Sequence, residues 1–151
     1  MEATNLHAAL LDAIRQRTVN GPRMIAIDGV DGGGKSSLGR FLACELAVPL
    51  IETDLFLDPE KGKGTYRLND IQAVITSRFS ADRPVILEGI FVLRLLSDLR
   101  IEPNYLIYVE NAASRESPTM TWRSTFDTYQ DEFQSRKRAD FVLTWARRPG
   151  E

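Results

Sequence analysis

A glycine-rich segment between an apolar run and an amphipathic segment constrains the fold of this chain most. Residues 29–36 read Gly-Val-Asp-Gly-Gly-Gly-Lys-Ser and match the pattern G-x-x-x-x-G-K-[S/T] at every fixed position. The preceding residues, 23–28, are almost continuously apolar and predict a buried strand, and residues 35–46 carry apolar side chains at helical spacing. The sequence therefore predicts a strand, a tight loop and a helix in direct succession.

The chemistry of this loop is that of a phosphate-binding site. Consecutive glycines let backbone N–H groups point inward around a phosphate, and the N-terminus of the following helix adds partial positive charge. Lys35 can bridge the terminal phosphates of a nucleotide, and the Ser36 hydroxyl can ligate Mg²⁺. A flexible glycine-rich turn is the alternative, but chance would place the full pattern in about one chain in 200 of this length. The residues predicted to bind the nucleotide are Gly29, Asp31, Gly32, Gly33, Gly34, Lys35, Ser36 and Ser37.

Strand-like and helix-like segments alternate along the rest of the chain. A helix is predicted over residues 5–17, where leucine and isoleucine recur at helical spacing. Further strands are expected at 48–52, 85–88, 105–109 and 141–143, and further helices from an N-cap at Asn69 through Phe79, within 90–99 and over 121–138. This alternation implies a mostly parallel sheet with helices on both faces. Because ligands bind outside the carboxyl ends of such strands, the residues directly after each strand are candidate site residues.

Three carboxylates follow strands near the glycine-rich loop. Glu88 ends an apolar run, and from a neighbouring strand it could provide a second ligand for the Mg²⁺ held by Ser36. Asp54 follows the second strand and could accept the proton of an attacking hydroxyl. Each has a structural alternative, a solvated strand end for Glu88 and a helix or turn cap for Asp54. Asp31, inside the loop, either contacts a ligand or braces the loop itself.

A phosphate-binding loop identifies a nucleotide and not a reaction, because GTPase switches, motor ATPases and small-molecule kinases all use one. The sequence contains no Asn-Lys-x-Asp segment of the kind that reads guanine. The strand that ends at Glu88 also lacks the aspartate followed by glutamate that motor ATPases carry. A phosphotransferase remains as the predicted class.

Three more segments agree in order and spacing with a known family. Thr53-Asp54-x-Phe56-Leu57, Ile86-Leu87-Glu88-Gly89-Ile90 and Arg138-Ala139-Asp140-Phe141-Val142 follow the glycine-rich loop. Over roughly residues 24–143 the chain resembles the uridine kinase family and its relatives pantothenate kinase and phosphoribulokinase. The resemblance implies an ATP-dependent transfer of the γ-phosphoryl group to a hydroxyl, with Asp54 as the base and Glu88 at Mg²⁺. It also implies the three-layer P-loop NTPase fold, in which a five-stranded parallel sheet has the order 2-3-1-4-5.

The chain departs from that family in two places. Uridine kinases carry a lid with closely spaced arginines after the fourth strand, whereas residues 110–123 offer only Arg115 and Arg123 to close over the developing charge. The acceptor-binding segment is compressed into residues 58–69, so no pyrimidine nucleoside is indicated. Tyr66 and Arg67 in that segment either contact the acceptor or are solvated.

Length and charge limit the remaining possibilities. The 151 residues suit a single domain, 1–151, and the formal net charge of −2 gives no field that would attract nucleic acid or an anionic membrane. Residues 1–5 lack a basic signal-peptide region, so a cytoplasmic protein is expected. Cys44 is expected in the core, and His7 in a surface or packing role rather than a catalytic one.

The leading prediction is an ATP- and Mg²⁺-dependent kinase acting on the hydroxyl of a small metabolite. The alternative is a nucleotide-binding regulatory or partner-binding module with little transferase activity. Asp54 favours the kinase, because a transferase needs a base and a binding module does not.

Overall fold

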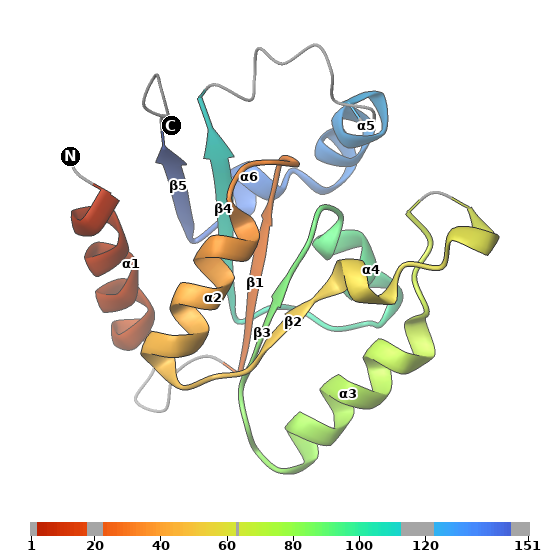
Figure 1. Ribbon diagram of the computed structural model, residues 1–151, viewed down its shortest axis with the longest axis horizontal. Helices are drawn as coiled ribbons and strands as arrows, with labels where there is room; N and C mark the ends of the chain where they lie inside the picture. The colour runs from red at the N-terminus through yellow and green to blue at the C-terminus, as the bar shows by residue number, and fades with distance from the viewer. Residues whose placement is uncertain (1–2, 18–22, 63, 113–122, 146–151) are drawn as a thin grey trace.

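The computed structural model describes residues 3–17, 23–62, 64–112 and 123–145. Its centre is a five-stranded sheet in which every strand pairs in parallel, in the order β2-β3-β1-β4-β5 (Figure 1). The strands are β1 (Met24–Gly29), β2 (Leu50–Glu52), β3 (Val85–Glu88), β4 (Tyr105–Asn111) and β5 (Phe141–Trp145). The predicted fold class is therefore confirmed, including the strand order 2-3-1-4-5.

Helices cover both faces of this sheet and make three layers. One face packs against α1 (Ala3–Arg17) and α2 (Lys35–Leu46). The other packs against α3 (Leu68–Ser80), α4 (Val92–Asp98) and α5 (Arg123–Phe133), while the short α6 (Ser135–Arg138) leads into β5. Two short 3₁₀ helices, η1 (Thr53–Phe56) and η2 (Pro59–Lys61), connect β2 to α3. None of the helices in the described ranges is long and apolar enough to cross a membrane.

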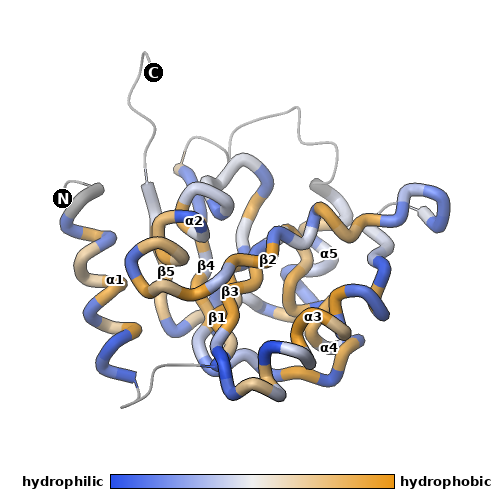
Figure 2. Tube along the Cα trace, turned by 60° about the horizontal axis from the view of Figure 1, so that its bottom comes forward, coloured by the Kyte–Doolittle hydropathy of each residue, from blue (hydrophilic) through white to orange (hydrophobic). Residues whose placement is uncertain are grey.

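The two cores follow from the two-residue period of the strands. In β1, Met24 and Ala26 contribute to the core under α3–α5, whereas Ile25 and Ile27 contribute to the core under α1 and α2. All six residues of β1 are buried, because the strand lies between β3 and β4 and is covered on both faces. Figure 2 shows the resulting concentration of hydrophobic residues along the central strands.

The predicted continuous helix over residues 121–138 is wrong. Gln134 adopts a left-handed conformation with φ 50° and ψ 41°, and this residue separates α5 from α6. The break turns α6 under the sheet, where Ser135 is fully buried.

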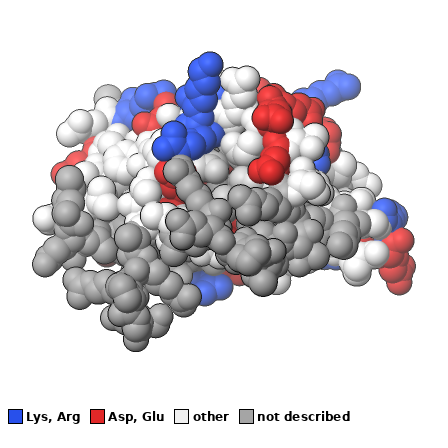
Figure 3. All heavy atoms as spheres, turned by 90° about the horizontal axis from the view of Figure 1, so that it is seen from above, with Lys and Arg blue, Asp and Glu red and all other residues white. Residues whose placement is uncertain are grey.

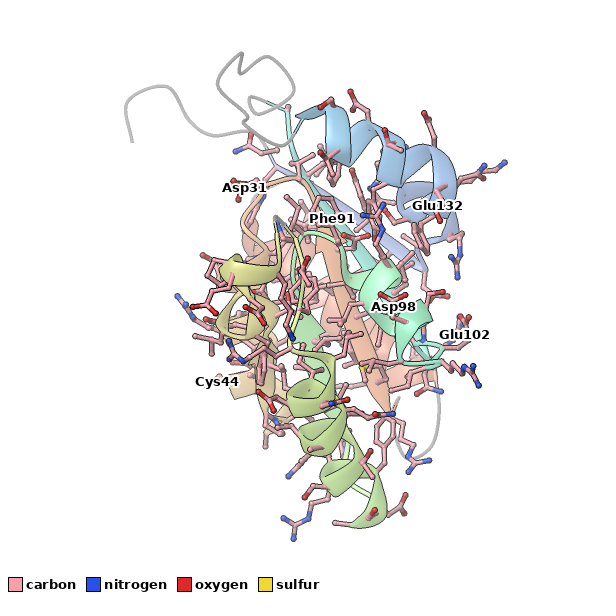
Figure 4. All side chains as sticks on the ribbon, turned by 90° about the vertical axis from the view of Figure 1, so that its right-hand side faces the viewer. Asp31, Cys44, Phe91, Asp98, Glu102 and Glu132 are labelled. Atoms are coloured by element: carbon pink, nitrogen blue, oxygen red, sulfur yellow. The ribbon has the colours of Figure 1, made fainter. Side chains whose placement is uncertain are left out.

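Two smaller predictions also need correction. Helix α3 begins at Leu68 with Arg67 at the N-cap position, so Asn69 is inside the first turn instead of capping it. Cys44 is exposed rather than in the core, because the buried side of α2 is formed by Leu38 and Leu42 (Figure 4). Two residues beyond Leu42 on a helix with 3.6 residues per turn, Cys44 points away from the sheet.

Gly29, the last residue of β1, is required by the close approach of β4. Its φ is +144°, and a Cβ atom at this position would lie 2.0 Å from the carbonyl oxygen of Val109. We expect Gly29→Ala to destabilise the protein by about 3 kcal/mol or more, since backbone strain and overpacking add. Urea unfolding measures this loss.

Gly32→Ala is the matched control for this prediction, because a Cβ atom at residue 32 would meet no atom within 4 Å. Only the cost of its left-handed backbone remains, about 1–2 kcal/mol. Equal losses for the two variants would show that the contact with β4 is not what requires Gly29.

Candidate functional site

A cavity of about 430 Å³ opens at the carboxyl ends of β1 and β3, where the glycine-rich loop leads into α2. Eight predicted site residues line it: Asp31, Gly32, Gly34, Lys35, Ser36, Ser37, Asp54 and Glu88. Five further lining residues are Leu57, Gly64, Tyr66, Ile90 and Phe91. In Figure 3, which looks onto this end of the molecule, both acidic and basic side chains reach the surface.

Lys35 is the first residue of α2 and is held inside the loop. Its Nζ donates to the carbonyl oxygen of Val30 at 2.8 Å, and the residue is only 8% exposed. Burial lowers the pKa of Lys35, while surrounding carboxylates, first among them Glu88, act in the opposite direction. The ammonium group therefore lies in a mostly acidic environment, beside the N-terminus of a twelve-residue helix.

Ser36 and Glu88 are brought together as predicted. The Ser36 hydroxyl donates to Glu88 Oε1 at 2.9 Å, although 52 residues separate the two in sequence. The pairing of Glu88 with Ile27 in the β1–β3 register brings this carboxylate to the loop. Burial raises the pKa of Glu88, and the hydrogen bond from Ser36 and the charge of Lys35 partly offset that rise.

These two oxygen ligands fit a magnesium ion. Mg²⁺ in nucleotide sites takes one or two protein oxygens and completes its shell with phosphate oxygens and water. The described residues contain no cluster of three or more His, Cys, Asp or Glu side chains that could enclose a metal alone. Ser36 and Glu88 are the residues that would hold such an ion beside a bound nucleotide.

Asp54 lies in η1, and its side chain borders the cavity beside Lys35 and Tyr66. The residue is exposed, so its carboxylate can meet a ligand that enters from solvent. The N-cap position of η1 is occupied by Glu52 and not by Asp54. Capping of this helix is therefore not the role of Asp54.

The sequence left open whether Tyr66 and Arg67 contact the acceptor or are solvated, and the structure places the two residues differently. Tyr66 lines the cavity, and burial raises the pKa of its phenol to about 12. The Thr53 hydroxyl lies nearby, but among the described residues neither hydroxyl has a partner with hydrogen-bond geometry. Arg67 is exposed, and its guanidinium donates to the carbonyl oxygens of Leu55 and Leu57 and to Asp70.

The loop residues also differ in how they contribute. Asp31 lines the cavity but also braces the loop, because its Oδ1 accepts the N–H of Gly32 at 3.0 Å. Gly29 and Gly33 are not among the lining residues. The N–H of Gly33 donates to the Val30 carbonyl at 3.1 Å, so this amide stabilises the loop itself.

The two predicted lid arginines are not placed by the structure. Arg115 lies outside the described residues. Arg123 begins α5, and its side chain is likewise outside the description. Their closing over a nucleotide stays a prediction.

Trp145 is a contact of the loop that the sequence did not predict. Its indole N–H donates to the Gly33 carbonyl at 2.6 Å, and its ring packs against Gly34. His7 stacks on Phe41 with ring centroids 4.8 Å apart and meets Trp145 edge-on, which confirms its packing role. No local pattern signals these contacts, because β5 was expected to end before Trp145.

Asp28 and Tyr129 form a second unpredicted contact, directly behind the loop. Both residues are fully buried, and the Tyr129 hydroxyl donates to Asp28 Oδ2 at 2.5 Å. In the sequence Asp28 is one polar residue within an apolar run, and Tyr129 lies 101 residues away. Only the return of α5 to the sheet brings them together.

The sequence matches no protein-family model, and no curated protein is recognisably similar to it. Solved structures do share its fold. A possible uridine kinase from Bacillus stearothermophilus superimposes with a TM-score of 0.69 at 16% identity, over 95% of this chain and 100% of that one. A sugar kinase from Janibacter sp. HTCC2649 has a TM-score of 0.52 at 15% identity, over 82% of this chain and 84% of its own.

A gluconokinase from Sinorhizobium meliloti 1021 likewise has a TM-score of 0.52, at 19% identity, over 83% of this chain and 82% of its own. At these identities the similarity concerns the fold. The strand order, the parallel sheet and the glycine-rich loop between β1 and α2 agree with that similarity. The chain therefore has the P-loop NTPase fold.

Proposed function

We propose that this protein is a kinase that transfers the γ-phosphoryl group of ATP to a hydroxyl of a small metabolite. The observation that carries the proposal is that the same cavity is lined by Lys35 and Ser36 of the glycine-rich loop and by the Asp54 carboxylate from η1. The kinases that share the fold support the same class of reaction.

The glycine-rich loop and Lys35 bind the nucleotide in this proposal. The first N–H groups of α2 have no partner within the helix and point toward a phosphate at its N-terminus. Lys35 exchanges its bond to the Val30 carbonyl for the β- and γ-phosphate oxygens. A bound Mg²⁺ would neutralise part of the phosphate charge, and Ser36 and Glu88 are the residues that would hold it.

Asp54 serves as the base that takes the proton of the acceptor hydroxyl. The acceptor oxygen forms a bond to the γ-phosphorus while the bond from that phosphorus to the bridging oxygen of ADP breaks. The proton of the acceptor hydroxyl passes to the Asp54 carboxylate, and the electron pair of the broken bond stays on ADP. Burial of Glu88 and exposure of Asp54 suit the two carboxylates to different roles.

The acceptor lies against the part of the cavity formed by Leu57, Tyr66, Ile90 and Phe91. Three of these side chains are wholly apolar, whereas Tyr66 supplies a buried hydroxyl without a partner in the described structure. The Tyr66 side chain lines the cavity, but its hydroxyl oxygen has almost no exposed surface in this structure. This hydroxyl is protonated at neutral pH with or without the rise in pKa that burial causes, so it is a hydrogen-bond donor.

A panel of acceptors tests the proposal. ADP formation from MgATP would be measured with nucleosides, sugars and pantothenate-like alcohols, and ATP affinity would be measured separately by calorimetry. ADP formation that depends on one acceptor class supports the kinase. ATP binding without acceptor-dependent turnover for any compound would favour the nucleotide-binding module instead.

Glu88→Gln is expected to raise the magnesium concentration needed for half-maximal activity by about tenfold or more, because an amide is a weaker Mg²⁺ ligand than a carboxylate. The fold should persist, since glutamine can still accept the hydrogen bond from Ser36. Glu52→Gln is the matched control at the end of β2, where the carboxylate pairs with Arg40. An unaltered magnesium dependence of Glu88→Gln would reduce Glu88 to a structural carboxylate.

A further inference from the structure

The hydroxyl of Tyr129 joins three segments that are distant in sequence. It donates to Asp28 Oδ2 at the end of β1, at 2.5 Å. It also accepts the backbone N–H of Leu93 in the first turn of α4, at 3.0 Å. Tyr129 itself lies in α5 and is fully buried, so no water competes for these bonds.

On one side this hydroxyl reaches the phosphate-binding loop. The other oxygen of Asp28 accepts the N–H of Gly29 at 2.8 Å, which fixes the point where β1 leads into the loop. The charge of Asp28 also favours the ammonium form of Lys35. Tyr129 is therefore linked through Asp28 to the start of the glycine-rich loop and to the charge of Lys35.

On the other side Tyr129 contacts Phe91, which belongs to the proposed acceptor wall, the part of the cavity formed by Leu57, Tyr66, Ile90 and Phe91. Its ring meets Phe91 edge-on, with centroids 5.2 Å apart and an interplanar angle of 71°. Phe91 lines the cavity and immediately precedes α4. In Figure 4, Phe91 lies between the loop that carries Asp31 and α5. The Arg94 guanidinium packs over both rings, 5.5 and 5.6 Å from their centroids.

We propose that Tyr129 is a positioning residue for phosphoryl transfer, which holds the phosphate-binding loop through Asp28 and the acceptor wall through α4 and Phe91 in one fixed geometry. This inference rests on the proposed kinase function. A relative displacement of about 1 Å between reacting groups is enough to slow transfer by about 100-fold.

The protonation of Asp28 gives this arrangement a measurable signature. Tyr129 from α5, Ser135 from α6 and Lys35 from α2 surround the carboxylate. Burial raises the pKa of Asp28 to about 6, and the hydrogen bond from Tyr129 opposes that rise. Removing the phenol hydroxyl should raise this pKa further, so that more Asp28 is neutral at pH 7.

The test is a double-mutant cycle with Tyr129→Phe, Asp28→Asn and the two combined. We expect Tyr129→Phe to lower kcat by about 10–100-fold while ATP affinity changes by less than about threefold. In the pH profile of kcat, the acidic limb of this variant should move to higher pH by about 1–2 units, because the Asp28 carboxylate loses its hydrogen bond from Tyr129. Asp28→Asn should lower kcat and lose this limb, and the double variant should be no slower than the slower single variant.

Tyr105→Phe is the matched control, since Tyr105 is a buried tyrosine of β4 at the opposite end of the sheet from the loop. It should leave kcat and the pH profile unchanged. An active wild type with Tyr129→Phe indistinguishable from Tyr105→Phe overturns the inference and leaves the kinase proposal intact. If Tyr129→Phe does not fold, a wild-type kcat and pH profile for Asp28→Asn overturns the inference as well. A wild type inert toward every acceptor overturns the kinase proposal and this inference with it.

Discussion

Lys35→Ala is expected to abolish phosphoryl transfer and to weaken ATP binding. Lys35 is the only cationic side chain among the described residues that line the cavity. Removing it leaves the phosphates close to Asp31, Asp54 and Glu88 with no cationic side chain of the described cavity lining to offset their charge. Transfer should fall by at least about 1,000-fold, and ATP affinity by about 10–100-fold, the equivalent of a lost charge-assisted hydrogen bond.

Calorimetry with ATP and an acceptor-dependent ADP assay on the same preparation check this result. Lys61→Ala is the matched control, because Lys61 is 73% exposed, pairs with Asp58 and does not line the cavity. The fold of Lys35→Ala should persist, since the buried ammonium is itself costly to desolvate. Unchanged ATP affinity would show that the glycine-rich loop does not bind a nucleotide in the proposed way.

Local patterns made the glycine-rich loop and its surroundings predictable from the sequence. The residues from β1 through α2 are consecutive, and their arrangement follows from glycine geometry and a helix N-terminus. Glu88 could be assigned because parallel strands end at the same edge of the sheet. The Ser36–Glu88 hydrogen bond required only that β3 lie beside β1.

Contacts made by the C-terminal third were not predictable in the same way. Tyr129 lies in a segment with helical periodicity, and nothing in that periodicity indicates that its hydroxyl meets Asp28. The break between α5 and α6 is made by Gln134 in a left-handed conformation. Glycine favours this conformation, so a glutamine in the sequence does not predict it. Trp145 contacts the loop because β5 continues beyond its apolar residues 141–143 and pairs with β4 as far as Asn111.

The wall of the cavity that we propose for the acceptor was predictable only in part, because irregular backbone forms most of it. Asp54 could be named from its place after β2, but the separation of Tyr66 from Arg67 depends on the antiparallel bridge between Leu57 and Tyr66. That bridge lines the cavity with Leu57 and Tyr66 and leaves Arg67 to bond backbone carbonyls outside it. Neither secondary-structure propensity nor hydrophobic periodicity predicts an isolated β-bridge between two loop residues.

Asp54→Asn separates the kinase from a binding module. Asparagine keeps the size and polarity of the side chain but lacks a basic oxygen, so it cannot take the proton of the acceptor. Transfer should fall by about 100–10,000-fold, the usual contribution of a general base. ATP affinity should stay near that of the wild type, because the proposed mechanism assigns phosphate binding to the loop and Lys35 and not to Asp54.

Stability should be nearly unchanged in this variant, since Asp54 is exposed and does not occupy the N-cap of η1. Asp58→Asn is the matched control, four residues further on and paired with Lys61 outside the cavity. The measurements are ATP affinity, melting temperature and acceptor-dependent turnover on both variants. Turnover of Asp54→Asn at the wild-type rate would refute Asp54 as the base, whereas a large loss of turnover with intact ATP binding is a separation that a nucleotide-binding module cannot produce.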